Sequence, residues 1–389
     1  MDNNEVLKQI TCRIYRERPV ISSNMRTNYR IERVCGDLLC DLWFLTTGCR
    51  HDAQGGCVMC NYGKHTGRVD EEQILCDLQD IVSKLPFEFG DFLLTSSGSL
   101  LDEREVPDRM RKRLLSILKD IRAKRVVIET RADTVTDTGL EFVKKLIPNS
   151  EKYIEIGVES SNDWILKHCI NKGTDFQTFQ KAVEQIHDKG ILVTANIGIG
   201  APFMSERAAV LYTVRSIRDV LKAGADSVVI FPYHVKHGTL LDVMYKQGMY
   251  QPVSLWSLVE VLNHFTEKEL LKIQISWYKD YFGEEKSHIY RSPVSCPECQ
   301  EYVMQELDYY RDRQGYGRIR KLSESACRCR KEWKRRLAEQ ADTIQIDAVE
   351  EMYRMLSQLY AVDEDMLEKE LYKMRQDYAC NWIKDIKKR

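Results

Sequence analysis

An apolar segment that ends in a polar turn recurs at least five times between residues 92 and 233, and helical patterns separate these segments. Short continuous runs of Val, Ile and Leu that alternate with helices of about ten or more residues are typical of a parallel sheet covered by helices. In such folds, the loops after the carboxyl ends of the strands form the binding site. The segments are 92–99, 125–131, 153–161, 192–202 and 227–233. We therefore predict an α/β fold whose site contains the Ser, Gly, Glu, Asn and Arg residues of these turns.

Three cysteines, Cys49, Cys57 and Cys60, lie on one glycine-rich loop directly after the apolar run Leu38 to Leu45. Three thiolates can bind three irons of a [4Fe–4S] cluster and leave the fourth iron open to another ligand. The glycines of the loop, which relieve steric limits on the backbone, are Gly48, Gly55, Gly56 and Gly63. A zinc site is the main alternative, because Cys-x-x-Cys is also a common zinc element. Buried cysteines without a ligand are the third interpretation.

A second set of cysteines, Cys296, Cys299, Cys327 and Cys329, forms two close pairs near the C-terminal end of the chain. Four thiolates are enough for a closed tetrahedral zinc site. An auxiliary iron–sulfur cluster is the main alternative, because the spacings of the pairs are less regular than in a zinc ribbon. Cysteines without a ligand are the third interpretation. The six other cysteines that lack ligand spacing, and that we interpret as core or surface residues, are Cys12, Cys35, Cys40, Cys76, Cys169 and Cys380.

Composition limits the class of protein. The chain has 389 residues, of which 43% are hydrophobic, so it can form a large barrel-like domain and a smaller extension. No apolar run approaches the ~18 residues of a membrane helix, and Met1 to Glu5 lack the features of a signal peptide. Thirteen cysteines, an odd number, fit a reducing compartment with metal ligands better than a disulfide scaffold. We therefore expect a cytoplasmic protein.

The segment from Arg311 to Arg336 is strongly basic, although the formal net charge of the whole chain is only −1. It holds eleven Arg or Lys against three acids, and four aromatic residues lie in or beside it: Tyr309, Tyr310, Tyr316 and Trp333. Basic side chains contact phosphates and aromatic rings stack on bases, so this segment suits RNA. A solvated helical face is the alternative, because that is the usual explanation of a charge run.

Taken together, these residues resemble the radical S-adenosylmethionine (SAM) superfamily, and within it the archaeosine-synthase radical SAM subunit and its relatives, a group akin to the Elongator catalytic subunit. The likeness covers roughly residues 30 to 335. Besides the cysteine loop, the motifs that carry it are Thr95 to Val106, Glu129-Thr130-Arg131, Gly157 to Ser160, Asn171-Lys172-Gly173, and Tyr250-Gln251-Pro252 with Leu255-Trp256-Ser257. The resemblance implies a partial (β/α)6 TIM-like radical SAM barrel with a small Cys-rich, mainly helical C-terminal extension.

The same resemblance implies the cofactors and the residues that bind them. Cys49, Cys57 and Cys60 would bind the cluster, and SAM would occupy its open iron and be cleaved to a 5′-deoxyadenosyl radical. Such chemistry belongs to the cofactor, which the protein orients. The residues expected near the SAM amino group are Ser97, Gly98 and Ser99. Those expected near its carboxylate, ribose, methionyl group and adenine are Arg131, Glu129, Glu159, Ser160, Asn196, Gly198 and Gly200.

The resemblance further implies a reaction and partners. Archaeal members of the group act with a partner transferase that adds lysine to a deazaguanine base of tRNA. The radical enzyme, a lyase, then cleaves a carbon–nitrogen bond of the adduct and leaves the formamidine of archaeosine. A flavodoxin- or ferredoxin-type reductant and no membrane are expected. Two alternatives stay open: radical SAM chemistry on another RNA base, a peptide or a small metabolite, and a non-catalytic zinc-dependent RNA-binding protein.

We predict three regions in the chain. Residues 1–37 form an arm that packs on the barrel or contacts substrate, residues 38–292 form the barrel, and residues 293–389 form a Cys-rich basic metal-binding module with a helical tail. Within the barrel, we expect helices over 70–84 and 174–189. His234 and His237 lack a third ligand nearby, so a substrate-facing loop is a better interpretation of them than a metal site.

Overall fold

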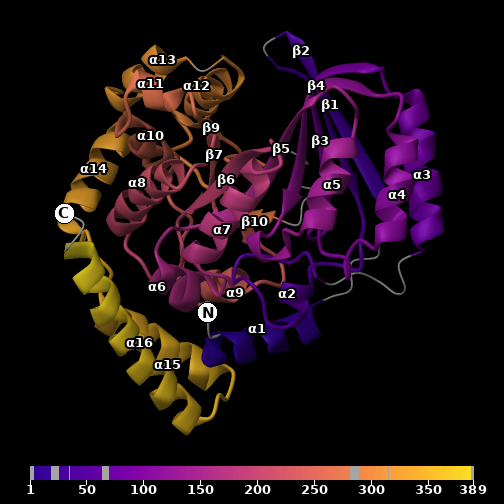
Figure 1. The fold of residues 1–389 in the computed structure, drawn as a ribbon. Coiled ribbons are helices and arrows are strands. Elements are labelled where there is room, and N and C mark those ends of the chain that lie inside the picture. Colours follow the sequence, from indigo (N-terminus) through magenta and orange to yellow (C-terminus); the bar gives the residue numbers. More distant parts are fainter. Residues whose placement is uncertain are drawn as a thin grey trace.

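A mostly parallel sheet of eight strands forms the centre of the protein (Figure 1). The computed structural model describes residues 4–18, 26–34, 36–63, 70–280, 289–313 and 315–386. In sheet order, the strands are β1 (Thr27–Val34), β2 (Asp37–Phe44), β3 (Glu88–Ser96), β4 (Arg122–Thr130), β5 (Glu151–Glu159), β6 (Leu192–Ile199), β7 (Ser227–Pro232) and β9 (Ile273–Ile275). Every pair from β2 onward is parallel, whereas β1 is antiparallel to β2. The predicted α/β fold is therefore confirmed.

The sheet curls into an open half-barrel with helices on its outer face (Figure 1). These helices are α3 (Glu71–Lys84), α4 (Asp108–Ile117), α5 (Asp137–Lys145), α7 (Phe176–His187), α8 (Glu206–Lys222) and α10 (Leu255–Asn263). Side-chain caps begin several of them: Asp70 accepts from Gln73 N at the start of α3, and Asp175 accepts from Thr178 N at the start of α7. The helices predicted over 70–84 and 174–189 are thus confirmed.

The two faces of the sheet differ in polarity. On β4 and β5, Val126, Ile128, Ile154 and Ile156 are fully buried beneath the outer helices. The residues between them on the inner face are half-buried and include charged side chains. The strands are therefore not apolar on both faces, because the half-barrel keeps its inner face open for polar groups.

The two ends of the chain meet below the barrel. Helix α1 (Glu5–Glu17) buries Val6, Leu7 and Ile10 in a hydrophobic cluster with residues of α15 (Ile346–Leu359) and α16 (Glu364–Ile386) (Figure 1). Within the predicted arm, α1 therefore packs below the barrel, whereas residues 27–34 form strand β1 of the sheet. Residues 1–3, 19–25 and Cys35 of that arm lie outside the described residues.

The Cys-rich region is helical and packs on the barrel. Its helices are α12 (Gln300–Arg313), α13 (Tyr316–Ser323) and α14 (Arg328–Glu339). Val303, Leu307 and Trp333 of these helices belong to the same hydrophobic core as the sheet. The predicted mainly helical C-terminal extension is confirmed, and it shares its core with the barrel. The short elements are α2 (Arg50–Ala53), η1 (Ala132–Thr134), α6 (Asp163–Ile165), the π-helix η2 (Leu166–Ile170), β8 (Val235–Lys236), α9 (Leu240–Lys246), α11 (Glu267–Leu270) and β10 (Ile289–Arg291).

Among the described residues, no helix is both long enough and apolar enough to cross a bilayer.

Candidate active site

The loop with the first three cysteines leaves the carboxyl end of β2. Gly48 turns the chain at φ +88°, and Cys49 is the N-cap residue of α2. The backbone nitrogen of Val58, between the other two cysteines, donates to the carbonyl of Ile170 at 3.0 Å. The loop is therefore tied both to its own strand and to the segment that follows β5.

Asp52, within this loop, fixes its shape through hydrogen bonds to Arg18 and Gly63. Its carboxylate accepts two hydrogen bonds from Arg18, at 2.6 and 3.2 Å, and one from the backbone nitrogen of Gly63 at 2.6 Å. Both charged side chains of the pair are 5% exposed. A Cβ on Gly56 would lie 2.5 Å from the Cα of Asp52, so only glycine fits there. Arg18 also donates to the carbonyl of Cys60 at 3.3 Å, which makes the N-terminal arm part of the loop's support.

Asn171 holds the loop from the other side. It adopts the left-handed conformation at φ 56°, directly after the π-helix η2. Its amide Nδ2 donates to the carbonyls of Gly55 and Gly56 at 2.6 and 3.0 Å. Neither Asn171 nor the Arg18–Asp52 pair was predicted to support the loop. In the sequence, the motif Asn171-Lys172-Gly173 was the one signal that pointed to this segment.

Burial raises the pKa of each thiol in the loop, and that of Cys60 reaches about 11. The three thiolates therefore need a cation to compensate for their poor solvation. Within the described part of the chain, the sulfurs of Cys49, Cys57 and Cys60 are not all within 4.8 Å of one another. Three thiolates on one loop can bind three irons of a [4Fe–4S] cluster.

The two serines of the turn after β3, Ser97 and Ser99, form hydrogen bonds to neighbouring segments through their hydroxyl groups. Ser97 Oγ accepts from the backbone nitrogen of Thr46 at 2.8 Å, and Ser99 Oγ lies 2.7 Å from Thr134 Oγ1. Both serines are 1% exposed, whereas Gly98 between them is half-buried. The hydroxyl groups of Ser97 and Ser99 are therefore engaged within the protein, and Gly98 leaves the backbone of the turn partly exposed.

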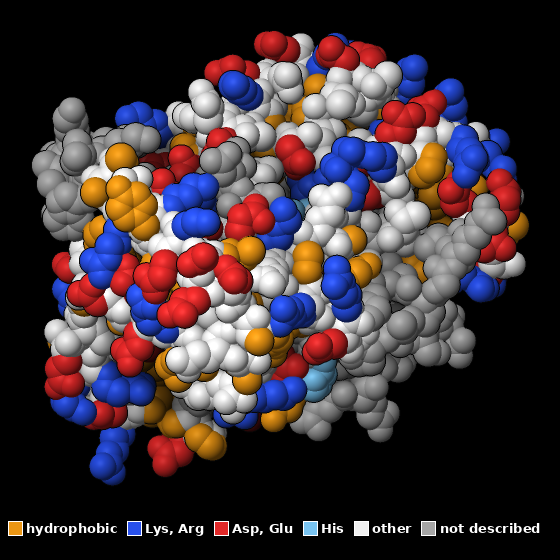
Figure 2. All heavy atoms as spheres, turned by 90° about the horizontal axis from the view of Figure 1, so that it is seen from below, with side chains coloured by type: hydrophobic (Ala, Val, Ile, Leu, Met, Phe, Trp, Pro, Cys, Tyr) orange, Lys and Arg blue, Asp and Glu red, His pale blue; other side chains and the backbone are white. Residues whose placement is uncertain are grey.

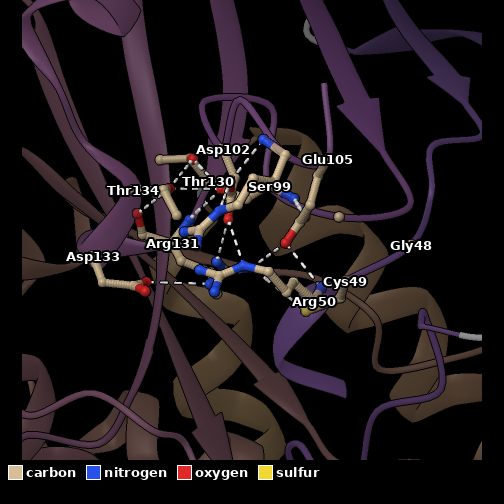
Figure 3. A network of polar contacts seen from close by, with 12 residues as sticks. Gly48, Cys49, Arg50, Ser99, Asp102, Glu105, Thr130, Arg131, Asp133 and Thr134 are labelled. Atoms are coloured by element: carbon tan, nitrogen blue, oxygen red, sulfur yellow. Dashed lines mark hydrogen bonds and ion pairs between the residues drawn. The ribbon is translucent and has the colours of Figure 1, made fainter. Parts of the chain in front are cut away.

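Arg131, directly after β4, lies at the centre of a polar network beside Cys49 (Figure 3). Its guanidinium donates to Glu105 at 2.7 Å, to Asp102 at 3.0 Å and to Asp133 at 3.2 Å. It also donates to Cys49 Sγ at 3.6 Å. Asp102 and Glu105 follow β3, so this network joins the turns after three different strands.

Glu129 and Asn196 meet on the inner face of the half-barrel through Glu155, a residue that was not predicted. Asn196 Nδ2 donates to Glu155 Oε1 at 2.6 Å. Burial, with the nearby carboxylates of Glu155 and Asp41, raises the pKa of Glu129 to about 8. The Glu129 carboxyl therefore holds its proton to higher pH than an ordinary carboxyl does, and when protonated it can both donate and accept a hydrogen bond.

Glu159 ends β5 in the left-handed region, at φ +68°. Its carboxylate accepts from Lys172 Nζ at 3.0 Å and from the Tyr233 hydroxyl at 3.1 Å. Burial opposes the charge on Lys172, but Glu159 and the thiols of Cys57 and Cys60 outweigh it and raise the pKa of the ammonium. Ser160, Gly198 and Gly200 line a recess beside Glu159. The structure thus brings four of the predicted cofactor residues together here.

A cleft of about 500 Å³ opens beside the cysteine loop. Its walls include Lys8, Arg50, Arg131 and Lys172. Figure 2 views the protein from below, the side on which α1 and α2 lie in Figure 1, and shows basic side chains gathered round the middle of this face. The cleft gives solvent access to the loop that carries the three cysteines.

The histidines of the loop after β7 have local partners. His234 Nδ1 lies 3.0 Å from Ser292 Oγ, and burial lowers the pKa of His234 to about 4. The ring of His237 packs against Tyr290 at 5.2 Å. Neither histidine joins a group of metal-ligating side chains in the described residues.

The four cysteines of the second set lie together in the structure. The Sγ atoms of Cys296 and Cys299 are 3.5 Å apart, and Cys327 and Cys329 are 3.4 Å apart. All four sulfurs lie within 4.8 Å of one another. A tetrahedral ion with metal–sulfur bonds of about 2.3 Å places its ligands about 3.8 Å apart. The indole nitrogen of Trp256, on α10, donates to Cys329 Sγ at 3.2 Å and ties this group to the barrel.

Comparison with known proteins places the chain in a family. Residues 43–209 match the profile of the radical SAM superfamily. Archaeosine synthase subunit beta of Methanosarcina acetivorans is 30% identical over 297 residues, which is 75% of this chain and 83% of that protein. The chain belongs to the radical SAM superfamily. Archaeosine synthase subunit beta of Thermococcus kodakarensis is 31% identical over 56% of this chain and 68% of its own length. The solved structure of archaeal Methanocaldococcus infernus Elp3 with an N-terminal deletion has a TM-score of 0.44 and 20% identity, over 62% of this chain and 59% of that one.

Membership in the radical SAM superfamily implies a [4Fe–4S] cluster and SAM as cofactors. The matched residues include the whole loop from Cys49 to Cys60. They also include the residues described above at the carboxyl ends of β3, β4, β5 and β6. The chain therefore has the fold and the cysteine loop of a radical SAM enzyme.

Proposed function

We propose that this protein is a tRNA-modifying radical SAM enzyme, a lyase that cleaves a carbon–nitrogen bond in a lysine adduct of a deazaguanine base and leaves an archaeosine-type formamidine. The observation that carries the proposal is the 30% identity to archaeosine synthase subunit beta over 75% of the chain. When bound, the cluster and SAM supply a 5′-deoxyadenosyl radical that takes a hydrogen atom from substrate.

The proposal assigns roles to the residues that the fold brings together. Cys49, Cys57 and Cys60 bind three irons of the cluster. The backbone of 97–99 receives the SAM amino group. Glu129 faces the ribose of SAM, and Asn196, Gly198 and Gly200 lie near its adenine. The Lys172–Glu159 pair positions the methionyl side near the cluster, because both side chains are buried and fixed by each other.

The partners follow from the same relatives. A protein named subunit beta has at least one other subunit, so we propose that a partner transferase prepares the lysine adduct that this enzyme cleaves. Reduction of the cluster requires a low-potential electron donor, for which we propose a flavodoxin- or ferredoxin-type protein.

The direct test uses anaerobically purified protein, SAM, reductant and tRNA that carries the lysine adduct. We expect 5′-deoxyadenosine to form in step with loss of the adduct and gain of archaeosine, measured by mass spectrometry of nucleosides. Unmodified tRNA is the matched control and should leave only slow uncoupled SAM cleavage. Rapid SAM cleavage without any change in the adduct would redirect the enzyme to another RNA base, a peptide or a small metabolite.

For the second cysteine set, we propose one structural zinc ion bound by Cys296, Cys299, Cys327 and Cys329. The four sulfurs are spaced for a single tetrahedral ion, and a cube of four irons and four sulfides would push them apart. A site with four protein ligands has no open position, which is typical of structural rather than catalytic zinc.

For the contact with tRNA, we propose the exposed face of α14. Lys331, Lys334 and Arg336 are exposed, and no carboxylate of the described residues lies within ion-pair distance of them. Arg335, in contrast, pairs with Glu332 and Glu339 on the same helix. The side chain of Arg313, which belongs to the basic segment, lies outside the described residues. Lys331 and Lys334 lie one turn apart on the same face of α14, and unpaired cations placed in this way attract a phosphate backbone.

Neutralising two of these cations tests that contact. We expect the double variant Lys331→Gln/Lys334→Gln to bind tRNA more weakly, with the slope of log affinity against log salt reduced by about two units. The matched control is Lys84→Gln/Lys112→Gln, which removes two exposed lysines that pair with Asp80 and Asp108 on the other side of the barrel. Equal tRNA affinity and salt dependence in both variants would leave α14 as a solvated helical face.

A further inference from the structure

Arg131 occupies a position in which four of its five N–H groups already have acceptors (Figure 3). Nε donates to Asp133, Nη2 donates to Asp102, and the two N–H groups of Nη1 face Glu105 and Cys49 Sγ. One N–H group remains. A bidentate contact with the carboxylate of SAM needs two.

The acceptors around Arg131 are themselves fixed. Glu105 Oε1 also accepts from the backbone nitrogen of Arg50 at 2.9 Å, and its other oxygen accepts from the backbone nitrogen of Ser99 at 2.5 Å. Asp102 accepts from the backbone nitrogen of Arg104 at 3.0 Å. Asp102 is 4% exposed and Glu105 is 2% exposed. Neither carboxylate can therefore release Arg131 without losing several other hydrogen bonds.

The charges of the network lead to the same conclusion. Arg131 contacts three carboxylates. One of them, Asp102, also pairs with the side chains of Arg50 and Arg104, and another, Glu105, also accepts from the backbone nitrogen of Arg50. Arg50, Arg104 and Arg131 together balance Asp102, Glu105 and Asp133. The group is neutral as a whole, so it offers little net attraction to the carboxylate of an incoming ligand.

We propose that Arg131 is a positioning residue for the cluster: its guanidinium donates a hydrogen bond to the sulfur of Cys49 and thereby raises the reduction potential of the cluster. A hydrogen bond to a ligand sulfur stabilises the reduced cluster, which carries one more negative charge. The inference rests on the proposed function, because it takes Cys49 as a cluster ligand. It replaces the assignment of Arg131 to the SAM carboxylate.

The test compares wild type with Arg131→Gln and Arg131→Lys after anaerobic reconstitution of the cluster. The midpoint potential is measured by redox titration followed by electron paramagnetic resonance, and SAM affinity is measured separately. For Arg131→Gln we expect a cluster about tenfold harder to reduce, or about 59 mV lower for a one-electron couple. Arg131→Lys keeps the positive charge but lacks the planar guanidinium, so its midpoint potential should lie between those of wild type and Arg131→Gln. SAM affinity should change less than about threefold, since the carboxylate is bound elsewhere.

Asp133→Asn is the matched control. It removes the partner of Nε but leaves the contact between Nη1 and Cys49, so its midpoint potential should not fall below that of wild type. An unchanged potential in Arg131→Gln, with SAM affinity at least tenfold weaker, would overturn the inference and return Arg131 to the SAM carboxylate. If Arg131→Gln retains no iron, the potential of Arg131→Lys decides between the same two outcomes. Failure of wild type itself to bind a cluster would contradict the proposed function instead.

Discussion

Replacement of Cys57 by alanine should remove the cluster and with it all cleavage of SAM. The loop offers three thiolates, and each is poorly solvated, so two of them do not compensate for the loss of the third. We expect iron to fall from about four atoms per chain to near zero, together with the visible absorption of the cluster. The formation of 5′-deoxyadenosine should drop to background. Cys49→Ala and Cys60→Ala should behave in the same way.

The control for this series is Cys76→Ala. Cys76 is an exposed thiol on α3 and belongs to neither cysteine set. It should keep wild-type iron content and wild-type SAM cleavage. Zinc in place of iron in the wild-type protein, with no 5′-deoxyadenosine after careful reconstitution, would contradict the enzyme assignment. The chain would then be a metal-dependent RNA-binding protein.

The second large effect is expected at the other cysteine set. Cys299→Ser should lose one zinc ion per chain and lower the free energy of unfolding by more than about 4 kcal/mol, because the binding energy of a structural metal is folding energy. Cys299 is buried, and its sulfur lies 3.4 Å from that of Cys329. Loss of the ion should also change the fluorescence of Trp256, whose indole nitrogen contacts Cys329. Metal analysis and thermal unfolding measure the result.

Two further measurements make the zinc prediction decisive. Cys380→Ser, which changes an exposed thiol on α16, should leave zinc content and the unfolding midpoint as in wild type. The iron of the first site should persist in Cys299→Ser. About eight irons per chain and no zinc in the wild-type protein would instead identify an auxiliary iron–sulfur cluster.

Several features of the site follow from local sequence. Strand and helix patterns depend on neighbouring residues, so the order of the elements and the placement of polar turns at strand ends were predictable. The spacing of Cys49, Cys57 and Cys60 constrains their ligands in the same local way. Asn171 shows the limit of this reasoning. Its motif was visible, but its contacts with Gly55 and Gly56 join residues more than a hundred positions apart.

The sequence by itself determined the parallel α/β fold, the two cysteine sets and the strand-end residues that line the barrel, because period and spacing are properties of short segments. Only the tertiary structure decided which of these side chains remain available to bind a cofactor or a metal ion. It surrounded Arg131 with three carboxylates and a cysteine sulfur, and it brought Arg18 of the N-terminal arm onto Asp52. It also set the four sulfurs from Cys296 to Cys329 at the spacing of one ion. The physical reason is that hydrogen bonds, charge balance and metal geometry depend on distances between segments, which spacing along the chain does not define.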